Sequence, residues 1–407
     1  MKNITIVIPT YWCRARGQAG QPEDAIFDHP TPLDESGTLQ RCLDSLKALH
    51  THGFRVLLIT APVHPLIAPE VEQRVEQLIE PFRANYPITQ FAPSDLQRVR
   101  RLLESHGLDP GLVSLEAYAQ IRNCQILGSV LLDSELIVAI DDDEIVPAGY
   151  LQRALLSMDM LERLAAGDAG LAGIYLDAAG DYRLKTAPEE AASDNKFVRK
   201  AELINRQFDA CLTVGEGVVE TPLALGGNMV FPRKLFRQVS FDPGITRGED
   251  IDYLMNSRLF GFTWFFDGKL TITHLPPKAS AGDPITTTSY AKLQRDVLRF
   301  VYQRQKIRLS QQHPDLQPLA PEDFGIYPGE FLKDDLDEQA LEALHVLRPP
   351  DADERFFPPA EQLLETARQR ARRAGEYPAF NASWKRVLDI VDAEEQLKEQ
   401  MRRKLGE

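Results

Sequence analysis

Four consecutive acidic residues stand at positions 141–144, directly after the apolar run 137–140. The apolar run predicts a buried strand. Because side chains alternate along a strand, Asp141 and Asp143 project to one side of its end and Asp142 to the other. Two carboxylates that close repel each other by roughly 4 kcal/mol at a surface-like dielectric. A hard divalent cation with oxygen ligands would relieve this repulsion. The simpler interpretation is a solvated acidic loop after a core strand.

A second acidic site and a later histidine favour the metal interpretation. Glu249 and Asp250 follow Gly248 at a predicted helix start, where the helix dipole alone also favours acids. His274 follows a strand candidate and is either structural or a further metal ligand. These separated segments predict one polar site that the fold has to assemble.

The composition argues against several classes of protein. With 407 residues and 43% hydrophobic content, the chain is expected to form two or more domains with a sizeable core. The formal net charge of −14 argues against binding nucleic acid over a broad surface. No apolar run approaches the ~20 residues that span a bilayer, and no signal-peptide pattern is present, so we expect a soluble, cytoplasmic protein. The scattered cysteines indicate neither a zinc site nor a disulfide framework: Cys13, Cys42, Cys124 and Cys211.

The acidic sites must be positioned by an α/β framework. Residues 4–8 and 54–59 predict strands, and the spacing of apolar residues over 39–49 predicts a helix between them. This strand–helix–strand unit implies a parallel sheet. The segment 12–36 is too long for an ordinary connection and is expected to be a functional or partly disordered loop.

Further elements continue this alternation up to about residue 278. Helices are predicted at 71–82, 94–106 and 115–132. Strands are predicted at 171–176, 226–231, 263–266 and 270–273, the last two flanking a turn at Asp267-Gly268. Ligands of an open parallel sheet bind beyond the carboxyl ends of its strands. The polar residues after the strands should therefore converge on one cleft.

Beyond residue 278 the pattern becomes helical. Helices are predicted at 289–308, 360–374 and 382–405, so we expect a C-terminal helical region, 279–407, beside a sheet domain, 1–278. This region is expected to bind the acceptor, form a homo-oligomer or dock on a partner. The basic face of its first helix is either solvated or associates weakly with a membrane surface: Lys292, Arg295, Arg299, Arg304, Lys306 and Arg308.

Four short motifs occur in a distinctive order. They are Pro9-Thr10-Tyr11 after the first strand, Arg122-Asn123 on a helix, Asp141-x-Asp143, and Gly248-Glu249-Asp250 with the later Arg258 and Gly261. In this combination the chain resembles the GT-A nucleotide-sugar glycosyltransferases, most closely family 2, over roughly residues 1–278. The resemblance implies an α/β fold of the GT-A (Rossmann-like) type, with a mostly parallel sheet flanked by helices and a C-terminal helical extension.

The resemblance also implies a reaction. A hexosyltransferase-type enzyme would move a sugar from a nucleotide-diphosphate sugar, of the UDP or GDP type, to an acceptor hydroxyl with inversion. A bound Mn²⁺ or Mg²⁺ would act as a Lewis acid on the departing diphosphate, worth several kcal/mol. The implied metal residues are Asp143, Asp141 and His274. Asp250 is implied as the general base, worth roughly 10²–10⁴-fold in rate, with Glu249 orienting the acceptor or supporting the loop.

The residues implied in binding the nucleotide sugar lie on the same motifs: Pro9, Thr10, Tyr11, Arg122, Asn123, Asp141, Asp142, Gly227 and Asn228. Each also has an ordinary structural interpretation. Arg122 is either a donor to phosphate or base or a helix-surface arginine. Gly227 either lets backbone approach the donor sugar or belongs to a simple turn. Trp12, Phe262 and Trp264 are expected in the core rather than stacked on a sugar or base.

The chain departs from the family pattern after its second strand. Residues 59–64 lack the acid that usually contacts the nucleotide base, and Asp34 and Glu35 on the inserted segment are the candidates to replace it. Two other reactions remain open. One is a retaining GT-A enzyme acting on a small acid such as glycerate. The other is a sugar-phosphate nucleotidyltransferase, for which Arg14 and Arg16 offer a weak basic, glycine-containing loop.

Overall fold

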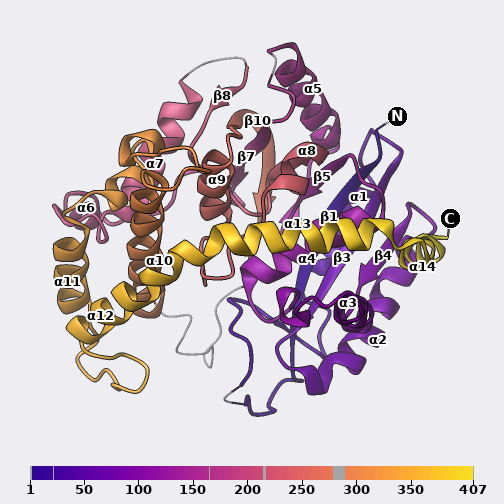
Figure 1. Cartoon of the computed structure of the whole chain (residues 1–407), viewed down its shortest axis with the longest axis horizontal. Coiled ribbons are helices and arrows are strands. Elements are labelled where there is room, and N and C mark those ends of the chain that lie inside the picture. The colour runs from indigo at the N-terminus through magenta and orange to yellow at the C-terminus, as the bar shows by residue number, and fades with distance from the viewer. Residues whose placement is uncertain (1, 22, 165, 214–216, 278–288, 407) are drawn as a thin grey trace.

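The structure, a computed structural model, describes residues 2–21, 23–164, 166–213, 217–277 and 289–406 (Figure 1). One sheet runs through it in the order β4-β3-β1-β5-β9-β7-β10-β6, with β2 paired to β1 and β8 to β10. The strands are β1 (Ile4–Cys13), β2 (Thr31–Pro32), β3 (Phe54–Pro62), β4 (Ile88–Phe91), β5 (Leu136–Ala139), β6 (Glu144–Ile145), β7 (Gly170–Leu176), β8 (Val219–Glu220), β9 (Met229–Pro232) and β10 (Trp264–His274). The helices are α1 (Leu39–Leu46), α2 (Ala68–Ile79), α3 (Pro93–Ser105), α4 (Tyr118–Leu131), α5 (Tyr150–Arg163), α6 (Pro188–Ala191), α7 (Lys200–Leu212), α8 (Arg233–Gln238), α9 (Glu249–Leu259), α10 (Ser289–Ser310), α11 (Leu336–Val346), α12 (Ala360–Ala371), α13 (Tyr377–Ala393) and α14 (Glu395–Leu405).

Parallel pairings predominate in this sheet. β1 pairs in parallel with β3 and β5, and β3 with β4. β9 lies antiparallel between β5 and β7, and β7 pairs in parallel with β10. The expected α/β class, a mostly parallel sheet flanked by helices, is therefore confirmed. Because β1 and β5 run in the same direction, Tyr11 and Asp141 both lie toward the same edge of the sheet.

The helix before the acidic strand is buried on every side. All residues of α4 from 121 to 131 are buried. One side of α4 packs on β1 and β3, and α13 crosses it (Figure 1). The polar side chains of this helix are therefore enclosed along with its apolar ones. Arg122 and Asn123 consequently lie in the interior, and Arg122 is not a helix-surface arginine.

Residues 264–274 form one strand instead of the predicted pair with a turn. β10 continues through Asp267, and its register against β7 shifts between Phe266 and Thr271, as in a β-bulge. Asp267 is fully buried. Its carboxylate is stable there because it accepts hydrogen bonds from Arg153 at 2.6 and 2.8 Å and from Ser157 at 2.5 Å. The prediction of a turn was wrong because an Asp-Gly pair usually indicates an exposed turn, whereas here α5 neutralises the carboxylate inside a bulge.

The C-terminal helices share the core of the sheet domain. One cluster of buried apolar side chains contains residues from Ile4 to Leu405. α13 and α14 lead back across α4 to β4 (Figure 1), where Lys404 pairs with Asp95 at 2.6 Å. The domain boundary expected at 278 falls on the first of residues 278–288, outside the described residues. None of the described helices has both the length and the hydropathy needed to cross a membrane.

The basic face expected on the first C-terminal helix is solvent-facing only in part, since Arg308 is exposed and Lys292 and Arg295 are partly buried. Within α10, Arg299, Arg304 and Lys306 are buried, and each is paired with an acid. Nζ of Lys306 lies 2.7 Å from Asp242 and 2.9 Å from Asp252, and all three side chains are at most 4% exposed. The expectation of a solvated face was wrong for these three residues, because acids elsewhere in the chain pair with Arg304 and Lys306 inside the fold. Weak association with a membrane surface stays a prediction.

Candidate active site

The acids and the histidine of the predicted metal site meet at the ends of two strands. β10 pairs antiparallel with β6, and this register places His274 opposite Glu144. Nε2 of His274 then lies 3.3 Å from Oδ2 of Asp143. The N–H of Leu275 donates to the carbonyl of Asp143 at 2.9 Å, which fixes the loop that carries this carboxylate. A carboxylate oxygen and an imidazole nitrogen thus face one point, as two ligands of a divalent cation would.

Negative charge is in excess around this point. Burial, together with the charge of Asp143, raises the pKa of Asp142 to about 8. Burial also raises the pKa of Glu144 well above its usual value, and Oε1 of Glu144 has no hydrogen-bond partner among the described residues. Burial lowers the pKa of His274, but the hydrogen bond to Asp143 and the charges of Asp143 and Asp141 together outweigh this and raise the pKa above the ordinary value. A cation beside Asp143 would reduce the cost of ionising these carboxyls.

Asp143 and His274 would by themselves form only part of a metal coordination sphere. Among the described residues, no group of three or more His, Cys, Asp or Glu side chains is arranged to hold a metal ion. Asp143 and His274 are two ligands of suitable chemistry, and a hard cation takes six or more oxygen-rich ligands. The donor set fits a cation whose remaining ligands are diphosphate oxygens and water.

Arg122 connects the two acidic sites. Its Nη2 donates to Oδ1 of Asp141 at 2.8 Å, and its Nε donates to Oε1 of Glu249 at 3.3 Å. The side chain is 5% exposed, so both ion pairs lie in a low-dielectric setting. Its Nη1 is buried and has no hydrogen-bond partner among the described residues. This guanidinium fixes the relative position of the two motifs and retains one donor for a bound anion.

Two glycines allow the strand β9 loop to reach these charged groups. A Cβ on Gly226 would lie 2.6 Å from Nη2 of Arg122, and a Cβ on Gly227 would lie 2.2 Å from Oε1 of Glu144. No real Cβ tolerates such distances, so a side chain at either position would displace Arg122 or Glu144. The glycines are therefore required for the close approach of this loop to Arg122 and Glu144 and not merely for a turn.

Glu249 and Asp250 begin α9 but have different surroundings. Glu249 is 8% exposed and is held by Arg122. Burial, together with the charge of Asp250, raises the pKa of Glu249 to about 7. Asp250 is only partly buried, and its Oδ2 accepts a hydrogen bond from the N–H of Gly226 at 3.1 Å. Asp250 is therefore the more accessible of the two carboxylates, while Glu249 is buried against Arg122.

Some predicted nucleotide-sugar residues have structural roles in the described chain. The amide of Asn123 is saturated by the backbone of Phe241, at 2.9 and 2.8 Å. The amide of Asn228 bonds to the carbonyls of Ile174 and Leu270 and to the hydroxyl of Tyr150. Pro9 and Thr10 are buried within β1. Asn123, Asn228 and Pro9 are thus covered by protein behind the site. The buried Oγ1 of Thr10, in contrast, has no hydrogen-bond partner among the described residues.

Tyr11 lies at the front of β1 and contacts the inserted segment. Its ring centroid is 4.7 Å from that of Phe27 and 5.4 Å from that of Tyr118. Trp12 and Trp264 are fully buried, which confirms that these two aromatics belong to the core. Part of the segment 12–36 is therefore folded against the end of β1 through the aromatic ring of Phe27.

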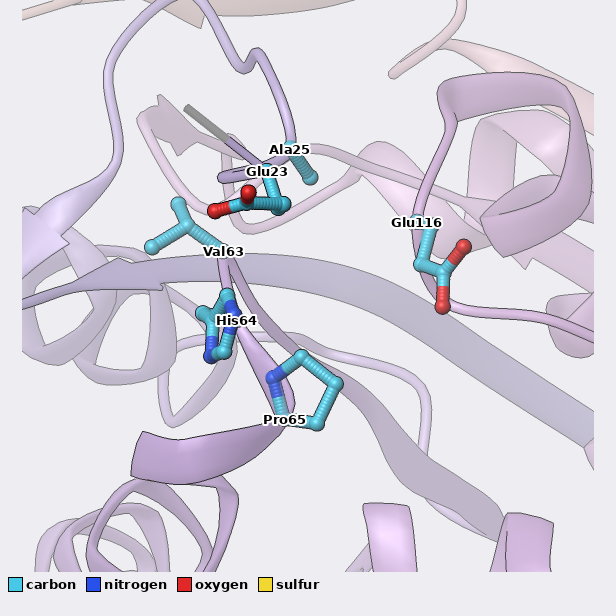
Figure 2. Close-up of a pocket in the computed structure, with 6 residues that line it drawn as sticks. All are labelled: Glu23, Ala25, Val63, His64, Pro65 and Glu116. Atoms are coloured by element: carbon cyan, nitrogen blue, oxygen red, sulfur yellow. The ribbon is translucent and has the colours of Figure 1, made fainter. Parts of the chain in front are cut away.

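A cavity of about 430 Å³ lies where β3 ends, beside this segment. Figure 2 shows Glu23 and His64 on one side of it and Glu116 on the other. The predicted substitutes for the missing acid are elsewhere engaged: Asp34 accepts a hydrogen bond from the N–H of Arg16, and Glu35 pairs with its side chain at 2.5 Å. The acids at the end of the second parallel strand are thus Glu23 and Glu116, which the sequence did not indicate.

Tyr175 is a further site residue that the sequence analysis missed. Its ring stacks on His274 with centroids 5.0 Å apart, and its hydroxyl accepts a hydrogen bond from the N–H of Gly227 at 2.6 Å. It therefore orients both the histidine and the glycine loop. A tyrosine near the end of a predicted strand carries no signal that separates this role from ordinary packing.

Comparisons with known proteins found solved structures only. No protein-family model matches the chain, and no curated protein matches it. It is similar to the mannosyltransferase PcManGT from Pyrobaculum calidifontis in complex with GDP-Man and Mn²⁺, at 14% identity and a TM-score of 0.45, over 97% of this chain and 88% of that chain. It is similar to S. aureus TarS 1-349 at 13% identity and a TM-score of 0.39, over 98% and 91%. It is also similar to GalNAc-T7 with UDP, GalNAc and Mn²⁺, at 12% identity and a TM-score of 0.43, over 86% and 58%. At these identities and TM-scores, the function has to be inferred from the residues of the site.

Proposed function

We propose that this chain is a metal-dependent glycosyltransferase of the GT-A type. It moves a hexose from a nucleoside-diphosphate sugar to an acceptor hydroxyl with inversion. The observation that carries the proposal is the contact between Asp143 and His274 at 3.3 Å. Arg122 connects this acidic segment to the start of α9, because it pairs with both Asp141 and Glu249. A metal site and a base are thereby held in one rigid unit.

The residues that would hold the metal are Asp143 and His274, with Asp141 close behind. When bound, Mn²⁺ or Mg²⁺ would supply Lewis-acid stabilisation of the charge that develops on the departing diphosphate. Arg122 is already ion-paired to Asp141, so Asp141 positions the guanidinium and adds negative charge near the cation. The ion pairs to Asp141 and Glu249 use Nη2 and Nε of Arg122. Its buried Nη1 therefore stays available and donates to a phosphate oxygen.

Asp250 acts as the general base in this proposal. The bond from the anomeric carbon to the diphosphate oxygen breaks, and its electron pair leaves with the diphosphate. The acceptor oxygen forms the new bond to that carbon, and its proton passes to the Asp250 carboxylate. Asp250 is suited to this because it is reachable, whereas Glu249 is buried and held by Arg122. Attack from the face opposite the leaving group inverts the anomeric centre.

The cavity at the end of β3 is the place proposed for the nucleotide base. Its carboxylates, Glu23 and Glu116, accept hydrogen bonds from ring N–H or exocyclic amino groups, and His64 offers a flat face. The structure offers less to the nucleotidyltransferase alternative, since Arg14 is paired with Asp24 and Arg16 with Glu35. Neither arginine is presented as a phosphate ligand.

The experiment that tests the proposal is a screen of nucleoside diphosphate sugars with and without Mn²⁺. Release of nucleoside diphosphate that requires the metal is expected from the intact chain and is expected to be lost in Asp143→Ala. A matched control is Asp168→Ala, which removes an exposed carboxylate that pairs with Lys234. Metal-independent turnover, or equal turnover in Asp143→Ala, would refute the proposal.

A further inference from the structure

Five cationic side chains from three segments gather beside the Gly-Glu-Asp motif. We refer to them as the cationic cluster: Lys200, Arg247, Lys292, Arg295 and Arg299. Lys200 lies at the start of α7, Arg247 in the loop before α9, and the other three on α10. In Figure 1 these helices stand together on the side of the molecule away from β4. A cluster drawn from three segments is a product of the fold and not of a local charge run.

Two carboxylates pair with four of these five cations. Asp28, on the inserted segment, lies 2.5 Å from Arg247 and 3.2 Å from Arg295. Asp296 pairs with Lys200 and lies 2.9 Å from Arg299. The cations thus outnumber the two carboxylates that pair with them, in a protein whose net charge is −14. An excess of this sign beside a partly buried carboxylate attracts anions.

Lys292 is the cation with the least compensation. Among the described residues, no group accepts a hydrogen bond from it or forms an ion pair with it. Burial lowers its pKa, and the positive charges of Arg247, Arg295 and Lys200 lower it further, beyond what Asp28 restores. A half-buried ammonium among other cations costs free energy unless an anion binds there.

The cluster lies against the backbone of the motif that carries the proposed base. Gly248 has a φ of +71°, and a Cβ there would lie 1.8 Å from Nη1 of Arg299, so the backbone of the motif rests on α10. Arg247 precedes Gly248 in the chain. Burial lowers the pKa of Arg299, but Tyr327 and Asp296, and to a smaller extent the negative charge of Asp250, raise it above the ordinary value. Arg122 links the motif to the metal site, and Arg299 links it to the cationic cluster.

The cluster is also open to a ligand. The side chains of Arg247 and Arg295 are 29% and 17% exposed, and that of Lys200 is 29% exposed. Guanidinium groups bind phosphate and carboxylate with paired donors, and an ammonium adds a point charge. The geometry suits a small anionic group held within reach of Asp250.

We propose that the acceptor carries a phosphate or carboxylate group and that Arg247, Lys292 and Arg295 bind this group so that a hydroxyl on the same molecule faces Asp250. The inference rests on the proposed function and adds to it the chemical class of the acceptor. The reaction is the glycosyl transfer written above, and the anionic group itself forms and breaks no covalent bond.

The test is calorimetric titration of the full chain with glycerol 3-phosphate, and with glycerol as the uncharged match. UDP or GDP and Mn²⁺ are kept saturating, so that the donor site is filled. Wild type is expected to bind glycerol 3-phosphate and not glycerol. Lys292→Gln and Arg247→Gln are each expected to weaken this binding about tenfold or more. The control Arg308→Gln, at an exposed position on the same helix, is expected to bind as wild type does.

Three outcomes would overturn the inference: no binding of glycerol 3-phosphate by wild type, unchanged binding in Lys292→Gln, or displacement of the nucleotide by glycerol 3-phosphate. The last would assign the phosphate to the donor site.

Melting temperatures verify folding, and Lys292→Gln breaks no described ion pair. Metal-dependent binding of the nucleotide is measured in the same samples. If it persists while glycerol 3-phosphate fails to bind, the acceptor class is wrong and the proposed function stands. If it is absent, the proposed function itself fails.

Discussion

Nε2 of His274 lies 3.3 Å from Oδ2 of Asp143, although one residue ends β10 and the other follows β5. The antiparallel pairing of β10 with β6 creates this contact, because it sets His274 opposite Glu144. The ring of Tyr175 stacks on the histidine and limits its rotation. A site fixed in this way is preorganised for a cation, which lowers the cost of binding it.

Substitution of His274 by alanine should therefore weaken metal-dependent nucleotide binding. Loss of groups that merely support a metal ligand typically costs 10–100-fold, so removal of a ligand is expected to cost about 100-fold or more in affinity for Mn²⁺ with nucleoside diphosphate. Calorimetry measures this directly. His345→Ala, at an exposed histidine paired with Glu361, is the control and should bind as wild type does. Equal affinities in the two variants would remove His274 from the metal site.

Asp250→Asn should slow turnover without weakening donor binding. General base catalysis contributes roughly 10²–10⁴-fold, and asparagine keeps the size of the side chain while removing its basicity. The measurement is nucleoside diphosphate release from a saturating donor, with affinity determined separately. A variant that loses affinity and rate together would show that Asp250 binds substrate and does not act as the base.

Lys306→Met should destabilise the protein strongly. Lys306 is the cation for both Asp242 and Asp252, and its removal leaves two buried carboxylates without compensation. Breaking a buried pair in this way costs about 3–5 kcal/mol in the free energy of unfolding. Arg308→Met, which breaks the exposed pair with Asp334, should cost less than about 1 kcal/mol. Urea unfolding measures both. A loss in the free energy of unfolding below about 1 kcal/mol for Lys306→Met would contradict the structural role of Lys306, Asp242 and Asp252.

Glu249 should make stability depend on pH. Burial and the charge of Asp250 raise its pKa from 4.5 to about 7, so between these values the native state binds more protons than the unfolded state. The free energy of unfolding then falls as pH rises through this window. Glu249→Gln mimics the protonated form and removes this fall. Its stability relative to wild type should increase from pH 5 to pH 8 by up to about 3 kcal/mol. A difference that stays constant with pH would show that Glu249 titrates normally.

Much of the framework could be predicted because it follows from local patterns. The β-branched run from residue 4 and the apolar run before Asp141 became β1 and β5, which are buried on both faces. The Gly-Glu-Asp segment begins a helix as expected, since Gly248 takes the left-handed conformation that ends the preceding loop. The first βαβ unit followed from its helical spacing and is present as β1, α1 and β3.

What could not be predicted depends on partners far away in the chain. β4 and α7 were missed, because a four-residue strand and a helix of mixed polarity give weak periodic signals. The burial of Lys306 depends on acids from α9 and the loop before it. Asn123 looked like a nucleotide ligand, yet its amide is used by the backbone of Phe241. Such roles are decided by tertiary packing, which residue spacing does not encode.

The central claim is that a divalent cation at Asp143 and His274 holds the departing nucleotide. Titration of the intact chain with UDP or GDP in the presence and absence of Mn²⁺ tests it most directly. The expected result is saturable heat that appears only with the metal and disappears in Asp143→Ala. Binding of equal strength without any divalent cation, or no binding in either condition, would contradict it.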